Sequence, residues 1–276
     1  MRRRFRFLRS RTGAIGAVIA VTVIALALFG PFFAPYGPGQ LLSEPGVLPG
    51  HGQLFGTDFL GRDVLSRVLW GGRSVLLDAT LATLLGYAVG GTVGLVAGYS
   101  RSFVDPLLMR TVDIVRAFPP LLFFFLLVAG AGQSSLVLVV GVAAVQAPGI
   151  ARLIHTATVE VSLRGYVEAA VARGDSTVTI LRREVLPNIL TPVIADFGLR
   201  STFSILFVIT VDFLGLGIQP PNANWALMIS ENREILTLNP WAIFVPAALI
   251  ALLTIGVNLI GDAIARSLGR TEVLPP

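Results

Sequence analysis

Six long apolar stretches divide the chain, and each approaches the length of a helix that crosses a membrane. A hydrocarbon core about 30 Å thick requires about 20 apolar residues in a helix. Segments of this kind lie at about 13–34, 74–98, 107–131, 135–157, 192–216 and 241–264. The pattern therefore predicts an all-α membrane protein with six transmembrane helices.

The third stretch is the least regular of the six. Its strongly apolar part, residues 117–131, would cover only about 22 Å at 1.5 Å per residue. We therefore expect the helix to extend back to about Leu107, with a bend near Pro119 and Pro120, since proline is a common cause of sharp helix kinks.

Composition supports a membrane location and excludes several kinds of chemistry. Only 13% of the residues are charged, against about 25% in an ordinary soluble domain. The sequence contains no Cys and two His, which excludes disulfides and argues against a Cys- or His-rich metal site. All 21 basic residues are Arg, so the chain cannot form a P-loop, which needs Lys. With no hydrolase or protease motif either, we expect no enzymatic activity in this chain.

The distribution of Arg predicts the orientation in the membrane. Sixteen Arg belong to the segments 1–12, 101–116, 152–183 and 266–270, whereas four belong to 62–73 and 233. Because basic residues are enriched on the cytoplasmic side, both termini are expected there. The net charge of +5 is explained by this asymmetry, so we expect no nucleic-acid partner.

The expected organisation follows from these spans. An Arg-rich cytoplasmic N-terminus at 1–12 precedes the first span at 13–34, and an external segment occupies 35–73. The core at 74–265 contains five spans and a cytoplasmic loop at 158–190, and a cytoplasmic tail follows at 266–276. Residues 1–27 also have features of a secretory signal, but the apolar run is long for one and continues through Phe33.

The polar loop at 158–190 contains signals for two short helices. A first helix begins near Tyr166, and Gly174 can end it. Asp175 and Ser176 can cap a second helix over 176–186, and Pro187 marks the start of the next segment. Periodicity alone leaves open whether this helix–turn–helix is only a connector between two spans.

The order of motif residues in this loop is informative. Glu168, Ala169, Ala170, Gly174 and the pair Leu186-Pro187 resemble the EAA loop of permease subunits of bacterial ABC importers. In that family the loop forms coupling helices that dock on a cytoplasmic ATPase. The sequence departs from the family pattern at Glu184, where the general pattern has Ile.

Two further segments resemble the dipeptide, oligopeptide and nickel branch of that family. The stretch FGTDFLGRDVLSR at 55–67 resembles a segment before the second helix, and FLGLGIQPP at 213–221 with Trp225 resembles a segment after the fifth. Asp212 and Ala226 replace the usual Ser and Gly. Taken alone, residues 55–67 are also compatible with a capped amphipathic turn. The three motifs together resemble the C-type member of the two paired permeases.

The resemblance implies a fold, a function and a set of partners. It implies a type I ABC importer permease fold and ATP-driven import of dipeptides or oligopeptides across a bacterial cytoplasmic membrane. The implied partners are a second homologous permease, two ATPase domains, an extracytoplasmic binding protein and lipid. ATP and Mg²⁺ would bind to the ATPases, and no cofactor is implied for this chain. Nickel, opine, glutathione or haem import is the alternative within the family. An ion-driven transporter or a membrane scaffold is the alternative outside it.

The second span contains glycines spaced four residues apart on one helix face. They are Gly86, Gly90, Gly94 and Gly98. Small residues at this spacing allow helices to approach closely in lipid. The stripe is expected to pack either within this chain or against the partner permease.

Charged residues inside the spans are costly and are candidates for function. Asp196 and Arg200 are four residues apart and can form an ion pair, with either a structural role or contact with substrate. Asp212 lies near the outer end of the same span and is the better candidate for lining the translocation route. A side chain that extends to the membrane interface is the alternative for Asp212.

Overall fold

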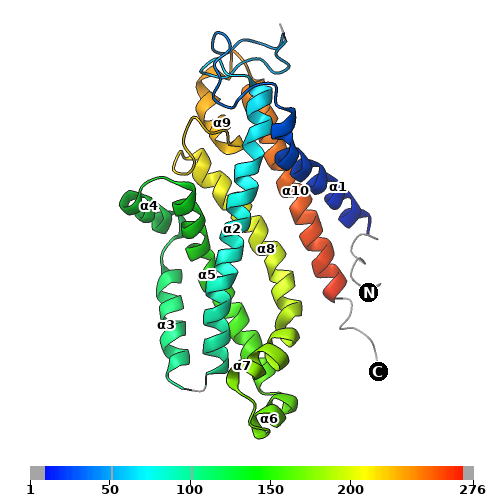
Figure 1. Cartoon of the computed structure of the whole chain (residues 1–276), viewed down its shortest axis with the longest axis vertical. Coiled ribbons are helices and arrows are strands. Elements are labelled where there is room, and N and C mark those ends of the chain that lie inside the picture. The colour runs from blue at the N-terminus through cyan, green and yellow to red at the C-terminus, as the bar shows by residue number, and fades with distance from the viewer. Residues whose placement is uncertain (1–9, 51, 101, 270–276) are drawn as a thin grey trace.

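A computed structural model describes residues 10–50, 52–100 and 102–269 as a bundle of helices (Figure 1). The longer helices are α1 (Arg11–Phe29), α2 (Val64–Tyr99), α5 (Ser135–Ser162), α8 (Leu186–Phe213) and α10 (Trp241–Gly269). The shorter helices are α3 (Val104–Ala117), α4 (Pro120–Ala131), α6 (Gly165–Ala172), α7 (Thr177–Ile180) and α9 (Trp225–Asn232). Short turns of other helix types lie at Gly30–Phe33, Leu181–Val185 and Arg233–Ile235.

The all-α membrane architecture predicted from the sequence is confirmed. Five helices in the described part of the chain are long and apolar enough to cross a membrane, and α3 with α4 forms a sixth candidate span with a 90° bend. The bend is sharper than the kink expected from the sequence, because the helix is interrupted there. Phe118 is extended, with φ −78° and ψ 131°, as is favoured for a residue before proline.

Helix α2 begins ten residues before the start expected at 74. The carboxylate of Asp63 caps the helix and accepts a hydrogen bond of 2.7 Å from the backbone N–H of Ser66. An acidic N-cap satisfies an amide that would otherwise lack a partner. The early start places Arg67 and Trp70 on a helix rather than in the loop that 35–73 was expected to form.

The glycine stripe of α2 packs against α5 of the same chain. Gly86, Gly90 and Gly94 are buried, and the backbone carbonyls of Ala147 and Ala151 on α5 lie next to Gly90 and Gly94. Gly98 faces the carbonyl of His155 in the same way. The stripe therefore serves packing within this bundle, and α5 occupies the face that the partner-permease alternative would need.

The two ends of the bundle differ in construction (Figure 1). At one end, residues 34–70 and 214–240 fold over the helices, and we name this region the cap. At the opposite end, α6 and α7 extend beyond α5 and α8. This second region lies within residues 158–190, and we name those residues the coupling loop. Motifs from the sequence occur in both regions.

Candidate functional site

The coupling loop is attached to the bundle by one apolar face. Val167, Ala170 and Ile180 are buried and pack in one cluster with Ile154 of α5 and Ile189 of α8. Val167 and Ala170 are three residues apart, so they lie on the same side of α6. This anchoring fixes both short helices to two of the long helices.

The opposite face of the coupling loop is exposed. Glu168 and Ala169 of the EAA motif are both exposed, whereas Ala170 is buried. The apolar side chains of Val171 and Val178 are 57% and 73% exposed. These apolar side chains are accessible to a partner, and burial of exposed apolar surface is a main driving force of protein association.

The turn between α6 and α7 depends on Gly174. Its φ is +79°, a left-handed conformation that a residue with a Cβ adopts at a cost. The amides of Gly174 and Asp175 donate to the carbonyls of Val171 and Ala170 at 2.9 and 3.2 Å. These bonds close the end of α6 as helix C-caps with glycine do. Ser176 caps α7, as its position in the sequence predicts.

The expected second helix of the loop does not end at Pro187. It continues through a π-helical turn at Leu181–Val185 into α8, which begins at Leu186. The amide of Leu186 donates to the carbonyl of Leu181, five residues earlier, as in a π-helix, and the following Pro187 has no N–H to donate. The motif pair Leu186-Pro187 thus marks a change in helix type. Nearby, the side-chain amide of Asn188 donates to the carbonyl of Glu184 at 2.6 Å.

Asp196 and Arg200 are brought together in α8. Arg200 Nε lies 3.2 Å from Asp196 Oδ2, and the hydroxyl of Tyr87 on α2 donates to the same oxygen at 2.6 Å. The pair is partly buried, with 10% of the Asp196 side chain and 27% of the Arg200 side chain exposed. Both groups donate to the same carboxylate oxygen, and the hydrogen bond from Tyr87 connects α8 to α2.

Asp212 occupies a closed site at the end of α8. Its side chain is fully buried, and its two oxygens accept hydrogen bonds from the amide of Ile218 at 3.1 Å and from Asn224 Nδ2 at 2.8 Å. Gly217 leaves room for the carboxylate. A residue that lines the translocation route has to be exposed to it, whereas Asp212 in this conformation organises the turn after α8.

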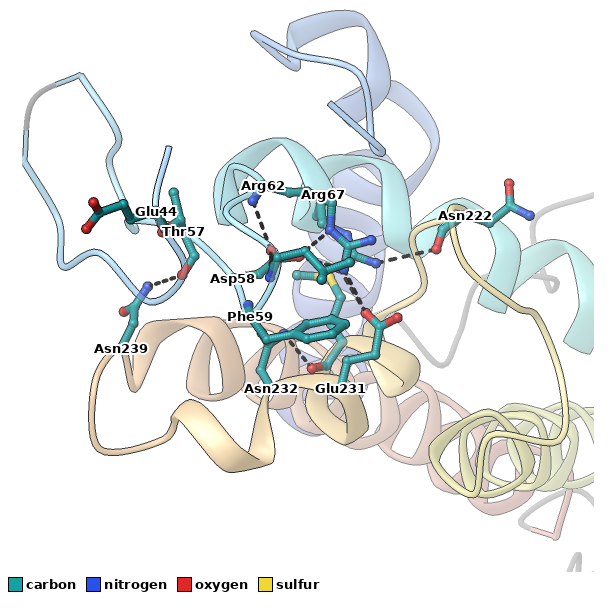
Figure 2. A network of polar contacts seen from close by, with 12 residues as sticks. Glu44, Thr57, Asp58, Phe59, Arg62, Arg67, Asn222, Glu231, Asn232 and Asn239 are labelled. Carbon is teal, nitrogen blue, oxygen red and sulfur yellow. Dashed lines mark hydrogen bonds and ion pairs between the residues drawn. The ribbon is translucent and has the colours of Figure 1, made fainter. Parts of the chain in front are cut away.

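Four buried charges lie together in the cap (Figure 2). Asp58 Oδ2 accepts from Arg62 Nε at 2.6 Å and from Arg67 Nη1 at 2.5 Å. Glu231 Oε2 accepts from the same Arg67 atom at 2.9 Å and from Arg62 Nη2 at 3.2 Å. Two positive and two negative groups balance in a site where the Arg67 side chain is 0% exposed. A buried charge without such a partner is strongly destabilising.

The packing of the cap shows why the motif at 55–67 has glycine at positions 56 and 61. Gly56 and Gly61 have φ of +70° and +80°, and each lies against a backbone carbonyl of the preceding loop, that of Val47 or Ser43. A Cβ would not fit at either position. Between them, Asp58 Oδ1 accepts from the amides of Leu60 and Arg62, both at 2.9 Å.

The motifs at 55–67 and 213–225 meet in the cap, although they are far apart in the sequence. Trp225 is fully buried, and its Nε1 donates to the carbonyl of Val68 at 2.7 Å. Asn232 Oδ1 accepts from the amide of Phe59 at 2.9 Å, and Asn239 bridges to the carbonyls of Phe55 and Thr57. Sequence reasoning missed Glu231, Asn232 and Asn239. The motif at 55–67 contains two Asp and two Arg, so its net charge gave no signal for a further acidic partner.

The chain matches two family models. Residues 90–271 match "Binding-protein-dependent transport system inner membrane component", and residues 2–45 match "N-terminal TM domain of oligopeptide transport permease C". A di/tripeptide transport system permease protein, DppC, of Pseudomonas aeruginosa is 36% identical over 93% of this chain and 87% of the relative. A glutathione transport system permease protein, GsiD, of Pectobacterium atrosepticum is 32% identical over 95% of this chain and 88% of the relative.

Solved structures agree on the fold. A chain of the inward-facing MetNI methionine ABC transporter superposes with a TM-score of 0.59 at 18% identity, covering 73% of this chain and 96% of that one. A chain of an amino acid ABC transporter gives 0.51 at 15% identity, with 72% and 89% covered. The type I importer permease fold expected from the motifs is confirmed, and the ion-driven and scaffold alternatives no longer apply. The chain belongs to the binding-protein-dependent transport system inner membrane components, the permease subunits of ABC importers.

Proposed function

We propose that this permease imports small peptides. We also propose that its coupling loop binds an ATPase subunit and transmits that subunit's ATP-driven conformational changes to the membrane helices. The observation that carries the proposal is the construction of the loop. One face of α6 and α7 is buried against α5 and α8, and the other presents Glu168, Val171 and Val178 to the surroundings. A docking element needs both an anchored face and an accessible one.

The anchoring supports a mechanical role. Because Val167 and Ala170 pack against Ile154 of α5 and Ile189 of α8, a displacement of the loop also moves those helices. Rigid-body movement of packed helices is a common basis of switching between states. ATP and Mg²⁺ bind in the proposed ATPase subunits, and two such domains would act on this chain and a second, homologous permease.

The relatives support peptides as the substrate class. The curated relatives at 32% and 36% identity are named for glutathione, which is itself a tripeptide, and for di- and tripeptides. Both substrates carry at least one free carboxylate and one amino group. We therefore place small peptides ahead of nickel, opines and haem as the transported solute.

The proposed orientation follows the Arg distribution. The coupling loop and both termini lie in the cytoplasm, and the cap faces the outside of a bacterial inner membrane, where a binding protein delivers the peptide. The coupling loop contains four Arg, at 164, 173, 182 and 183, and Arg152 precedes it on α5. The ion pairs of Arg152, Arg164 and Arg173 are exposed, whereas those of Arg62 and Arg67 in the cap are buried.

Gly174→Val tests the proposal. The φ of +79° is unfavourable for a β-branched residue, so the variant should change the turn that presents α6 and α7. In proteoliposomes containing the complete importer, we expect ATP hydrolysis to persist while uptake of a radiolabelled tripeptide falls about tenfold or more, the size of effect that a misplaced functional group causes.

Gly165→Val is the matched control in the same loop. A Cβ at Gly165 meets no atom within 4 Å, and its backbone is not left-handed. Its uptake should equal that of the unmodified chain. Unchanged uptake by Gly174→Val, or equal losses in both variants, would count against coupling through this turn.

A further inference from the structure

Arg200 of α8 has more hydrogen-bonding capacity than this chain uses. A guanidinium group offers five N–H donors. Only Nε donates within the described residues, to Asp196 at 3.2 Å, and no acceptor in that part of the chain is bonded to Nη1 or Nη2. A cation in a membrane-spanning helix is costly, and such residues usually mark a pathway or a pair.

On the side of α5, the guanidinium of Arg200 packs against a residue that has no side chain. This residue is Gly149, where an added Cβ would lie 2.8 Å from both Nη1 and Nη2. Any larger residue at 149 would displace the guanidinium. The side chain is 27% exposed, so part of it is accessible from outside this chain.

A cavity lies at the end of the bundle that carries the coupling loop, and Arg200 is not among its lining residues. It measures about 730 Å³ and lies between the last turns of α5 and the first turns of α8, with Glu160, Ile189, Pro192 and Ala195 among its lining residues. Ile189, Pro192, Asp196 and Arg200 are spaced by three or four residues, so they follow one face of α8. Arg200 lies about 8 Å beyond Ala195 along the helix, at 1.5 Å per residue.

We propose that Arg200 is a binding subsite for the carboxylate of the transported peptide. The inference rests on peptide import as the proposed function. A guanidinium binds a carboxylate through two parallel N–H···O bonds, and the two Nη atoms are the pair available for this contact. Asp196, bonded to Nε and held by Tyr87, positions the guanidinium, and Gly149 provides the space.

Arg200→Gln tests the subsite in the reconstituted importer with a radiolabelled tripeptide. Loss of a charge-assisted contact should reduce uptake about tenfold, and Arg200→Lys should retain more uptake than Arg200→Gln. Co-purification with the partner permease and ATP hydrolysis should remain unchanged. Failure of co-purification in Arg200→Gln would overturn the proposal, because it would show that Arg200 pairs with the partner permease instead.

The double variant Asp196→Asn/Arg200→Gln separates substrate binding from internal charge balance. If Arg200 only neutralises Asp196, removing both charges should restore uptake, and this result would overturn the proposal. A carboxylate subsite predicts that the double variant stays as low as Arg200→Gln. Because no charge is left unpaired in the double variant, its fold is also less at risk.

Gly149→Ala tests the space above the guanidinium without altering any charge. It should reduce uptake, whereas Gly198→Ala is the matched control, because a Cβ at Gly198 has its nearest neighbour at 3.9 Å. Equal uptake by the two variants would contradict the positioning role of Gly149. If the unmodified importer takes up no peptide, the proposed function fails; if it does and Arg200→Gln equals it, only the subsite fails.

Discussion

The cap and the coupling loop both contain family motifs, but they use their motif residues in opposite ways. In the cap, Asp58, Arg62 and Arg67 are buried and bonded to one another or to Glu231. In the coupling loop, Glu168, Ala169 and Val178 are exposed. A motif whose polar groups are satisfied internally maintains a shape, whereas a motif whose side chains remain exposed is available to a partner. The comparison predicts that substitutions in the cap change stability and that substitutions in the loop change binding.

The largest loss of stability is expected for Arg67→Ala. The change leaves Asp58 and Glu231 with one cation instead of two in a buried site, and breaking a buried ion pair typically costs about 3–5 kcal/mol. Thermal unfolding of the detergent-purified chain measures the effect. Arg233→Ala, an exposed arginine of the same cap, is the control and should unfold as the unmodified chain does. Equal stability of the two variants would contradict the structural role of the cap motif.

A smaller loss is expected for Asn224→Ala. The Asn224 side chain caps α9 by accepting from the amides of Ala226 and Leu227, and it donates to Asp212. Loss of a helix N-cap costs about 1–2 kcal/mol. The same unfolding assay should show no change for Asn222→Ala, because Asn222 is exposed. A loss in Asn222→Ala as large as in Asn224→Ala would show that the cap is sensitive for another reason.

The smallest effect on stability is expected for Val178→Ser in the coupling loop. The side chain is 73% exposed, and such surface changes usually alter stability by no more than about 0.5 kcal/mol. Its affinity for the ATPase should nevertheless fall about tenfold, since full burial of a valine contributes about 1.5–3 kcal/mol. Leu48→Ser, an exposed apolar residue of the cap, should leave ATPase affinity unchanged. Titration of labelled ATPase onto the permease complex distinguishes these outcomes.

The sequence predicted the membrane-spanning helices well because the thickness of the membrane sets their length and composition. It did not predict the first ten residues of α2, since Arg67 was expected in an exposed loop. One of its two acidic partners, Asp58, is nine residues away in the same motif. The other, Glu231, is 164 residues away, and no local pattern connects it to the motif. The sequence predicted the position of the bend near Pro119 but not its angle of 90°.

The features of the candidate sites that depend on local sequence signals could be predicted, and those that depend on burial could not. The helix–turn–helix of the coupling loop follows from local signals at Gly174 and Ser176, and the structure places both where those signals indicate. The pairing of Asp196 with Arg200 is local too, at a spacing of four residues. Burial is not local, so the sequence could not show that Asp212 is enclosed by Gly217, Ile218 and Asn224, nor that the glycine stripe faces α5.

Single-cysteine cross-linking tests the central claim, that the coupling loop and not the cap receives the ATPase. The chain has no Cys, so Val178→Cys and Leu48→Cys each introduce one unique thiol at an exposed position. With an ATPase partner bearing one surface cysteine, a short bismaleimide should cross-link the variant at 178 in the assembled importer and should not cross-link the variant at 48. A cross-link at 48, or none at 178 in an importer that hydrolyses ATP and takes up peptide, would contradict the account.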